Sequence, residues 1–103
     1  MILEKGVVLV EVLGNRWNMR ILWILREGPL RFTELKKRMG DVNSKTITEH
    51  LRVLERYHVI DRAVFAEVPP RVEYSLTEHG RAFLPVFKVI YDWAASLPPP
   101  KEN

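Results

Sequence analysis

The chain is short, mildly basic and free of cysteine. Its 103 residues are 47% hydrophobic and 28% charged, which is typical of one soluble globular domain. The lack of cysteine excludes disulfides, thiolate metal sites and thiol-based sensors from this sequence. No apolar run approaches the ~20 residues of a membrane span, so we expect a cytoplasmic protein with no membrane contact.

Positive charge is concentrated in the middle of the chain. The net charge is +3, from 16 Lys and Arg against 13 Asp and Glu. Residues 31–62 carry eight of the basic and only five of the acidic side chains. A surface that faces a polyanion shows such an excess, but so do many ordinary solvated surfaces.

Two helices are predicted at the N-terminus. Residues 3–13 are apolar almost all round and are followed by Gly14, so most faces of this helix must be covered. Asn15 is a good N-cap for a second helix over residues 16–26, which the next Gly-Pro pair ends.

A pair of helices follows a short extended segment at residues 30–32. Thr33 is expected to cap the first helix of the pair, which a Gly-Asp break ends after Met39. Asn43 is expected to cap the second helix, over residues 44–57. The apolar residues of this second helix form one stripe, Ile47, Leu51 and Leu54.

The last part of the chain predicts a hairpin and a final helix. Residues 59–67 and 72–76 alternate between polar and apolar side chains, and the two prolines between them belong in a turn. Thr77 is expected to cap a helix that runs to about Ala95. We therefore predict one domain over residues 1–97 and a short extended proline-rich tail over residues 98–103.

The element order predicts a winged helix-turn-helix, a mainly α fold with a small β-hairpin (α+β). The helix pair joined by a short turn fits the helix-turn-helix motif, and the hairpin directly after it fits the wing. In this fold the helix at residues 44–57 would lie in the DNA major groove. The wing at residues 59–76 would lie along the backbone or in the minor groove.

The helix at residues 44–57 carries side chains suited to DNA. If its apolar stripe is buried, the remaining faces present cations and short polar groups, which contact phosphates and base edges. The candidate contacts are Ser44, Lys45, Thr46, Thr48, Glu49, His50 and Arg52. A merely solvated face has a similar composition, but the preceding helix and the following hairpin favour the DNA-binding interpretation.

Three further cations are candidate DNA contacts with weaker support. Arg71 lies at the hairpin tip beside two prolines, where it reaches a phosphate or the minor groove, or pairs with Glu67 or Glu73. Lys36 in the first helix of the pair, and Arg16 near a helix N-terminus, are each either backbone contacts or ordinary surface charges.

Four stretches of the sequence resemble the HxlR-type winged helix-turn-helix regulators. They are LGNRW (13–17), ILREGPLRFTELK (24–36), LRVLE (51–55) and EVPPRVEYSLTEHG (67–80), of which the last is the most specific. The resemblance implies a homodimeric transcription regulator whose first and last helices form the dimer. Many members carry a redox-sensing cysteine just before the first helix, and this sequence has none.

The final helix independently predicts dimerisation. Its apolar residues cover too wide an arc for one chain of this length to bury, and a large exposed apolar patch marks an interface. The predicted interface residues are Val8, Val12, Phe87, Ile90, Tyr91 and Ala94. A two-fold dimer would bind a pseudo-palindromic site, with its two recognition helices ~34 Å apart.

No catalytic, cofactor or metal site is predicted. The three histidines lack metal-ligand spacing, and the sequence has no phosphate loop or nucleophile–base pair. Two alternatives to a sequence-specific regulator stay open, a winged-helix protein-interaction module and a non-specific architectural DNA binder. No residue identifies a small-molecule effector.

Overall fold

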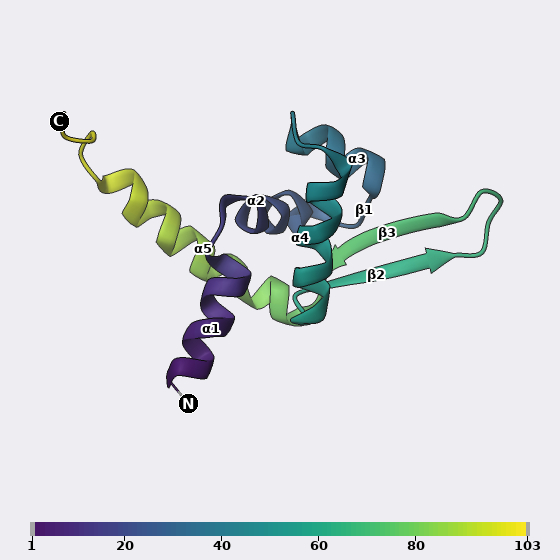
Figure 1. Cartoon of the computed structure of the whole chain (residues 1–103), viewed down its shortest axis with the longest axis horizontal. Helices are drawn as coiled ribbons and strands as arrows, with labels where there is room; N and C mark the ends of the chain where they lie inside the picture. Colours follow the sequence, from purple (N-terminus) through teal and green to yellow (C-terminus); the bar gives the residue numbers. More distant parts are fainter. Residues whose placement is uncertain (1, 103) are drawn as a thin grey trace.

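The computed structural model describes residues 2–102 and has the winged helix-turn-helix architecture that the sequence predicts (Figure 1). The elements in chain order are α1 (Ile2–Leu13), α2 (Arg16–Ile24), a 3₁₀ turn (Leu25–Glu27), β1 (Leu30–Arg31), α3 (Phe32–Met39), α4 (Ser44–Arg56), β2 (Ile60–Phe65), β3 (Arg71–Leu76) and α5 (Glu78–Ser96). In Figure 1 the wing, β2 and β3, extends from one side of the central helices, and α1 and α5 extend from the other.

The sheet has three strands in the antiparallel order β1-β3-β2. The predicted hairpin is present, with Ile60 paired to Leu76. The extended segment before α3 adds a third strand, because Leu30 pairs with Tyr74. The sequence of this two-residue segment does not predict the pairing, because its partner strand lies more than 40 residues later in the chain.

The core lies between α2, α3, α4 and one face of the sheet. The predicted stripe of α4, Ile47, Leu51 and Leu54, is almost completely buried. It packs with the other fully buried side chains of the core, Ile21, Leu22, Leu25, Leu35, Met39 and Ile60. Burial of the stripe fixes which side of α4 remains exposed.

Three of the four predicted helix caps are confirmed. Asn15, Asn43 and Thr77 each accept a hydrogen bond from the backbone amide three residues later, at 2.8, 2.9 and 3.1 Å. The predicted cap at Thr33 is wrong, because α3 already begins at Phe32. Arg31 is the N-cap residue of α3 instead. Its backbone amide donates a hydrogen bond to the Glu34 carboxylate at 3.1 Å, which stabilises the start of the helix.

The first turn of α5 is locked against the base of the wing. Gly80 is buried, and a Cβ atom there would lie 2.3 Å from the Val59 carbonyl oxygen. The Thr77 hydroxyl donates to the His58 carbonyl oxygen at 2.6 Å. His58 has a φ of 62°, in the left-handed region, where it closes the end of α4. The start of α5 is therefore fixed relative to α4.

The outer parts of α1 and α5 are poorly covered. One chain does not cover most faces of α1, since Val7, Leu9 and Val10 are 56–66% exposed, and their cover by a second copy stays a prediction. Residues 98–102 contain no helix or strand and are exposed. None of the helices in residues 2–102 is long and apolar enough to cross a membrane.

Candidate nucleic-acid interface

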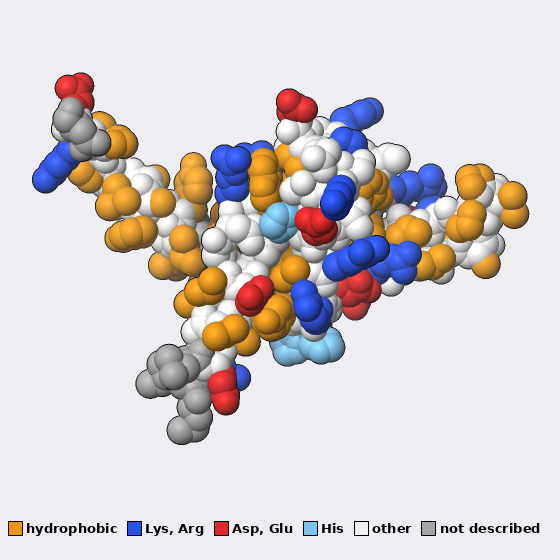
Figure 2. Space-filling view, viewed as in Figure 1, with side chains coloured by type: hydrophobic (Ala, Val, Ile, Leu, Met, Phe, Trp, Pro, Cys, Tyr) orange, Lys and Arg blue, Asp and Glu red, His pale blue; other side chains and the backbone are white. Residues whose placement is uncertain are grey.

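The exposed face of α4 presents the predicted polar side chains and two cations without partners. Ser44, Lys45, Glu49 and Arg52 are exposed, and Thr46 and Thr48 are partly buried at its flanks. Lys45 and Arg52 make no hydrogen bond or ion pair within residues 2–102. In Figure 2 Lys and Arg side chains line α4 and reach the base of the wing, with acidic side chains between them. The helix has 13 residues, so it is ~20 Å long.

His50 has a side-chain partner within the chain. It is partly buried, and its Nδ1 lies 2.9 Å from the side-chain oxygen of Asn18. Asn18 is completely buried, and its amide nitrogen donates to the Glu11 carbonyl oxygen at 3.1 Å. The ring joins α4 to α2 and, through Asn18, to α1. A DNA contact at His50 stays a prediction, and it would use the other ring nitrogen.

Lys36 and Arg16 each have a contact inside the chain. Lys36 donates from Nζ to the Val42 carbonyl oxygen at 3.0 Å and so closes the turn between α3 and α4. The exposed guanidinium of Arg16 lies 4.5 Å from the centre of the Trp17 ring. Lys37 and Arg38, on the outer side of α3, have no partner in the described part of the chain.

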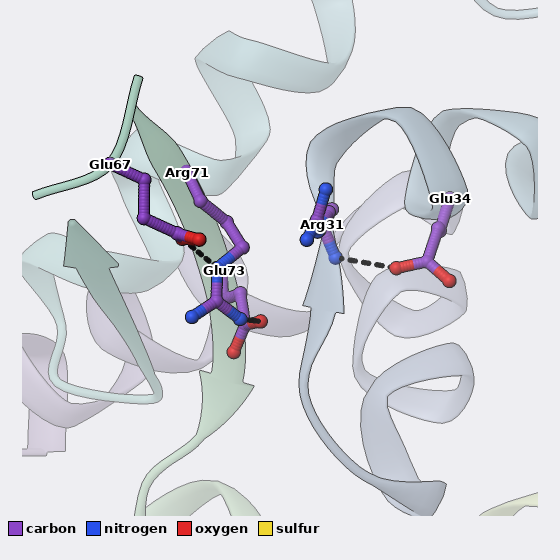
Figure 3. A network of polar contacts seen from close by, with 5 residues as sticks. All are labelled: Arg31, Glu34, Glu67, Arg71 and Glu73. Carbon is purple, nitrogen blue, oxygen red and sulfur yellow. Dashed lines mark hydrogen bonds and ion pairs between the residues drawn. The ribbon is translucent and has the colours of Figure 1, made fainter. Parts of the chain in front are cut away.

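Arg71 is held by the wing itself. Figure 3 shows its guanidinium between two carboxylates, with Nε 2.5 Å from Glu67 and Nη1 donating a hydrogen bond to Glu73. It also lies 4.0 Å from the centre of the Phe65 ring. The hydrogen bond with Glu67 is the main reason that the pKa of Arg71 is raised above its ordinary value. Of the two interpretations that the sequence left open for Arg71, the structure shows the ion pair.

The wing places a different cation beside α4, one that was not among the residues predicted from the sequence. Arg62 on β2 is exposed and borders the same cleft as Arg52 of α4. The alternation of side chains along β2 could have identified it. Arg62 lies two residues after the buried Ile60, so both side chains are on the same face of the strand.

The family model for HxlR-like helix-turn-helix proteins matches residues 12–102. The chain belongs to this family. An uncharacterised HTH-type transcriptional regulator of Methanothermobacter thermautotrophicus is 38% identical over 96 residues, which span 93% of this chain and 73% of that protein. The reduced form of the transcriptional regulator YodB from Bacillus subtilis is similar in structure, with a TM-score of 0.79 and 36% identity over 88% of this chain and 89% of that one.

Some structural relatives of this HxlR-like chain are redox regulators. The reduced form of the redox regulator HypR has a TM-score of 0.80 and 31% identity, and the match covers 93% of this chain and 92% of that one. The 103 residues of this sequence contain no cysteine. Any regulation of the DNA-binding surface that these residues provide therefore uses chemistry other than a thiol.

The terminal helices of this HxlR-like chain expose a second surface, which is apolar. Among the predicted interface residues, Val8, Ile90, Tyr91 and Ala94 are exposed. Phe87 is partly buried and stacks on Trp23 at 4.9 Å between ring centres. Val12 does not belong to this surface, because it is 8% exposed and packs in the core of its own chain.

Within residues 2–102 no group of three or more His, Asp or Glu side chains is placed to hold a metal ion. The candidate site is a surface of cations and short polar groups on α4 and β2.

Proposed function

We propose that this HxlR-family transcriptional regulator binds double-stranded DNA as a homodimer, with α4 in the major groove and the wing along the backbone. One observation carries the proposal: α4 buries a complete apolar stripe and leaves Lys45 and Arg52 unpaired on the opposite face. A helix held rigidly on one side, with unpaired cations on the other, suits contacts to base edges and phosphates.

The apolar surface of α1 and α5 supports the homodimer. Leu9, Val89 and Tyr91 are 60–68% exposed on these two helices, and large exposed apolar side chains in such numbers mark an interface. Two-fold symmetry would present two copies of α4 about one turn of DNA apart, ~34 Å. The expected binding site is therefore a pseudo-palindrome.

Selection of bound duplexes from a random pool, followed by sequencing, tests this proposal. We expect a pseudo-palindromic motif to be enriched, and we expect its affinity to fall as salt concentration rises. Lys45→Ala and Arg52→Ala weaken binding without a change in the unfolding midpoint. Lys101→Ala, which removes the same charge from the exposed tail, is the matched control.

Three other outcomes would contradict parts of the proposal. Unchanged affinity of both α4 variants would show that α4 is not the recognition helix. Binding without an enriched motif would indicate an architectural DNA binder. No binding even at low salt would favour a protein-interaction module, for which the exposed Val68 at the wing tip offers an apolar contact.

Two further expectations follow from the same interpretation. Because its relatives are named as transcriptional regulators, we expect the chain to catalyse no reaction. A regulator that binds chromosomal DNA works where that DNA is, so we expect it in the cytoplasm.

A further inference from the structure

The two arginines of the wing lie on opposite faces of the sheet. Residues paired across antiparallel strands share a face, and successive residues alternate. Leu30, Tyr74 and Arg62 are paired in one row across the three strands, on the face that packs against the core. Arg71, paired with Phe65, falls on the other face. Only Arg62 is therefore directed toward α4.

A cleft separates α4 from this part of the wing. Its volume is about 350 Å³. Its lining residues are Thr48, Leu51, Arg52, Glu55, Arg62 and Tyr74. The two arginines come from different elements, and neither has a hydrogen-bond or ion-pair partner among residues 2–102. Two guanidinium groups without partners at one cleft attract an anion.

Two residues that carry hydroxyl groups, Thr48 and Tyr74, line the same cleft. The Tyr74 side chain is 8% exposed and makes no hydrogen bond in the described part of the chain. In that part no buried side-chain nitrogen or oxygen lacks a partner, so the hydroxyl must reach solvent. Tyr74 lines the cleft, and its hydroxyl is available there to donate to a ligand, as is that of the partly buried Thr48.

We propose that this cleft binds one backbone phosphate of double-stranded DNA, held jointly by Arg52 from the recognition helix and Arg62 from the wing. This inference rests on the proposed function. It means that α4 and β2 contact the same phosphate, which holds the recognition helix and the wing on one DNA strand. Glu55 also lines the cleft, and its carboxylate repels a phosphate. Binding therefore requires both cations, which outweigh the single negative charge.

The test is the salt dependence of binding to a mixed-sequence duplex, measured by fluorescence anisotropy. Each phosphate contact contributes about 0.9 to the slope of log K against log salt concentration. Arg62→Ala is expected to lower the association constant about tenfold and to reduce the slope. A homodimer carries this cleft twice, so the double variant of Arg52→Ala and Arg62→Ala loses about 1.8 of slope per dimer, about 0.9 for the one phosphate held in each protomer.

The control is Arg81→Ala, which removes one exposed cation from the start of α5. It should leave the slope unchanged, and urea unfolding should show that every variant is folded. Glu55→Gln should raise the association constant, since it removes the repulsive charge.

Several results would overturn the inference. A slope loss of about 3.6 per dimer in the double variant would mean that the two arginines of each protomer hold separate phosphates. If Arg62→Ala binds DNA as well as wild type and Arg52→Ala binds more weakly, the two arginines do not share a phosphate. The proposed function would still hold. If the wild-type protein binds no duplex, both the phosphate site and the proposed DNA-binding function are wrong.

Discussion

The helices α4 and α5 are both rich in apolar residues, but this chain buries only those of α4. In α4 the apolar stripe is 0–1% exposed, and the opposite face is polar. In α5 only Gly80 is buried, and Val89, Tyr91 and Trp93 are 63–68% exposed. The difference shows that α4 is packed within one chain, whereas much of α5 is left exposed, as the proposed homodimer requires.

The largest expected effect is the loss of a buried side chain from α4. Leu51→Ala should lower the free energy of unfolding by about 3 kcal/mol at every protein concentration, because it leaves a cavity in the core. Urea denaturation measures the change. Val89→Ala in α5, studied at concentrations too low for dimers, is the matched control and should cost less than about 0.5 kcal/mol. Equal losses for both variants would remove the contrast between the two helices.

The next effect concerns the polar bridge that orients α4. Asn18→Ala should lower the free energy of unfolding by about 2 kcal/mol, because it leaves the Glu11 carbonyl oxygen and His50 Nδ1 without their partner. A double-mutant cycle with His50→Ala should show coupling between the two sites. Strict additivity would mean that the Asn18–His50 bond does not help to fix α4.

A charge on the exposed face of α5 should affect association and leave folding intact. Tyr91→Glu is expected to weaken the dimer at least about tenfold, because it places a carboxylate in an apolar interface. Sedimentation velocity across a concentration series measures the shift, and far-ultraviolet circular dichroism checks the fold. Arg81→Glu puts the same side chain at an exposed position near the start of α5 and should leave the dimer intact. A dimer unaffected by Tyr91→Glu would place the interface elsewhere.

The smallest expected effect is that of the exposed ion pair Lys88–Asp92 on α5. Its hydrogen bond at 2.8 Å raises the pKa of Lys88 above the ordinary 10.5. A base with a raised pKa in the folded state stabilises the fold below its ordinary pKa, and this contribution is lost as pH rises through the raised value. The stability difference between wild type and Lys88→Met should therefore be small and constant near neutral pH and should vanish at strongly alkaline pH. A difference that grows with pH would contradict this sign.

The sequence predicted only part of the candidate site, because several of the predicted side chains are hydrogen-bonded to other parts of the chain. The face of α4 followed from its helical period, and Lys45 and Arg52 lie where that period puts them. His50, Lys36 and Arg71 have the same chemistry in the sequence, but partners from the fold occupy them. Those partners, Asn18, Val42 and Glu67, lie 4 to 32 residues away, and no local pattern selects among them.

The sequence by itself determined the fold class, the stripe of α4 and the caps at Asn15, Asn43 and Thr77, because each depends on residues within a few positions of one another. Only the tertiary structure decided that Leu30 joins the sheet, that Val12 packs inside and that Arg62 faces Arg52. These outcomes depend on strand register and on helix packing across the chain. The physical reason is that tertiary packing decides which polar groups find partners, and those left without one form the proposed binding surface.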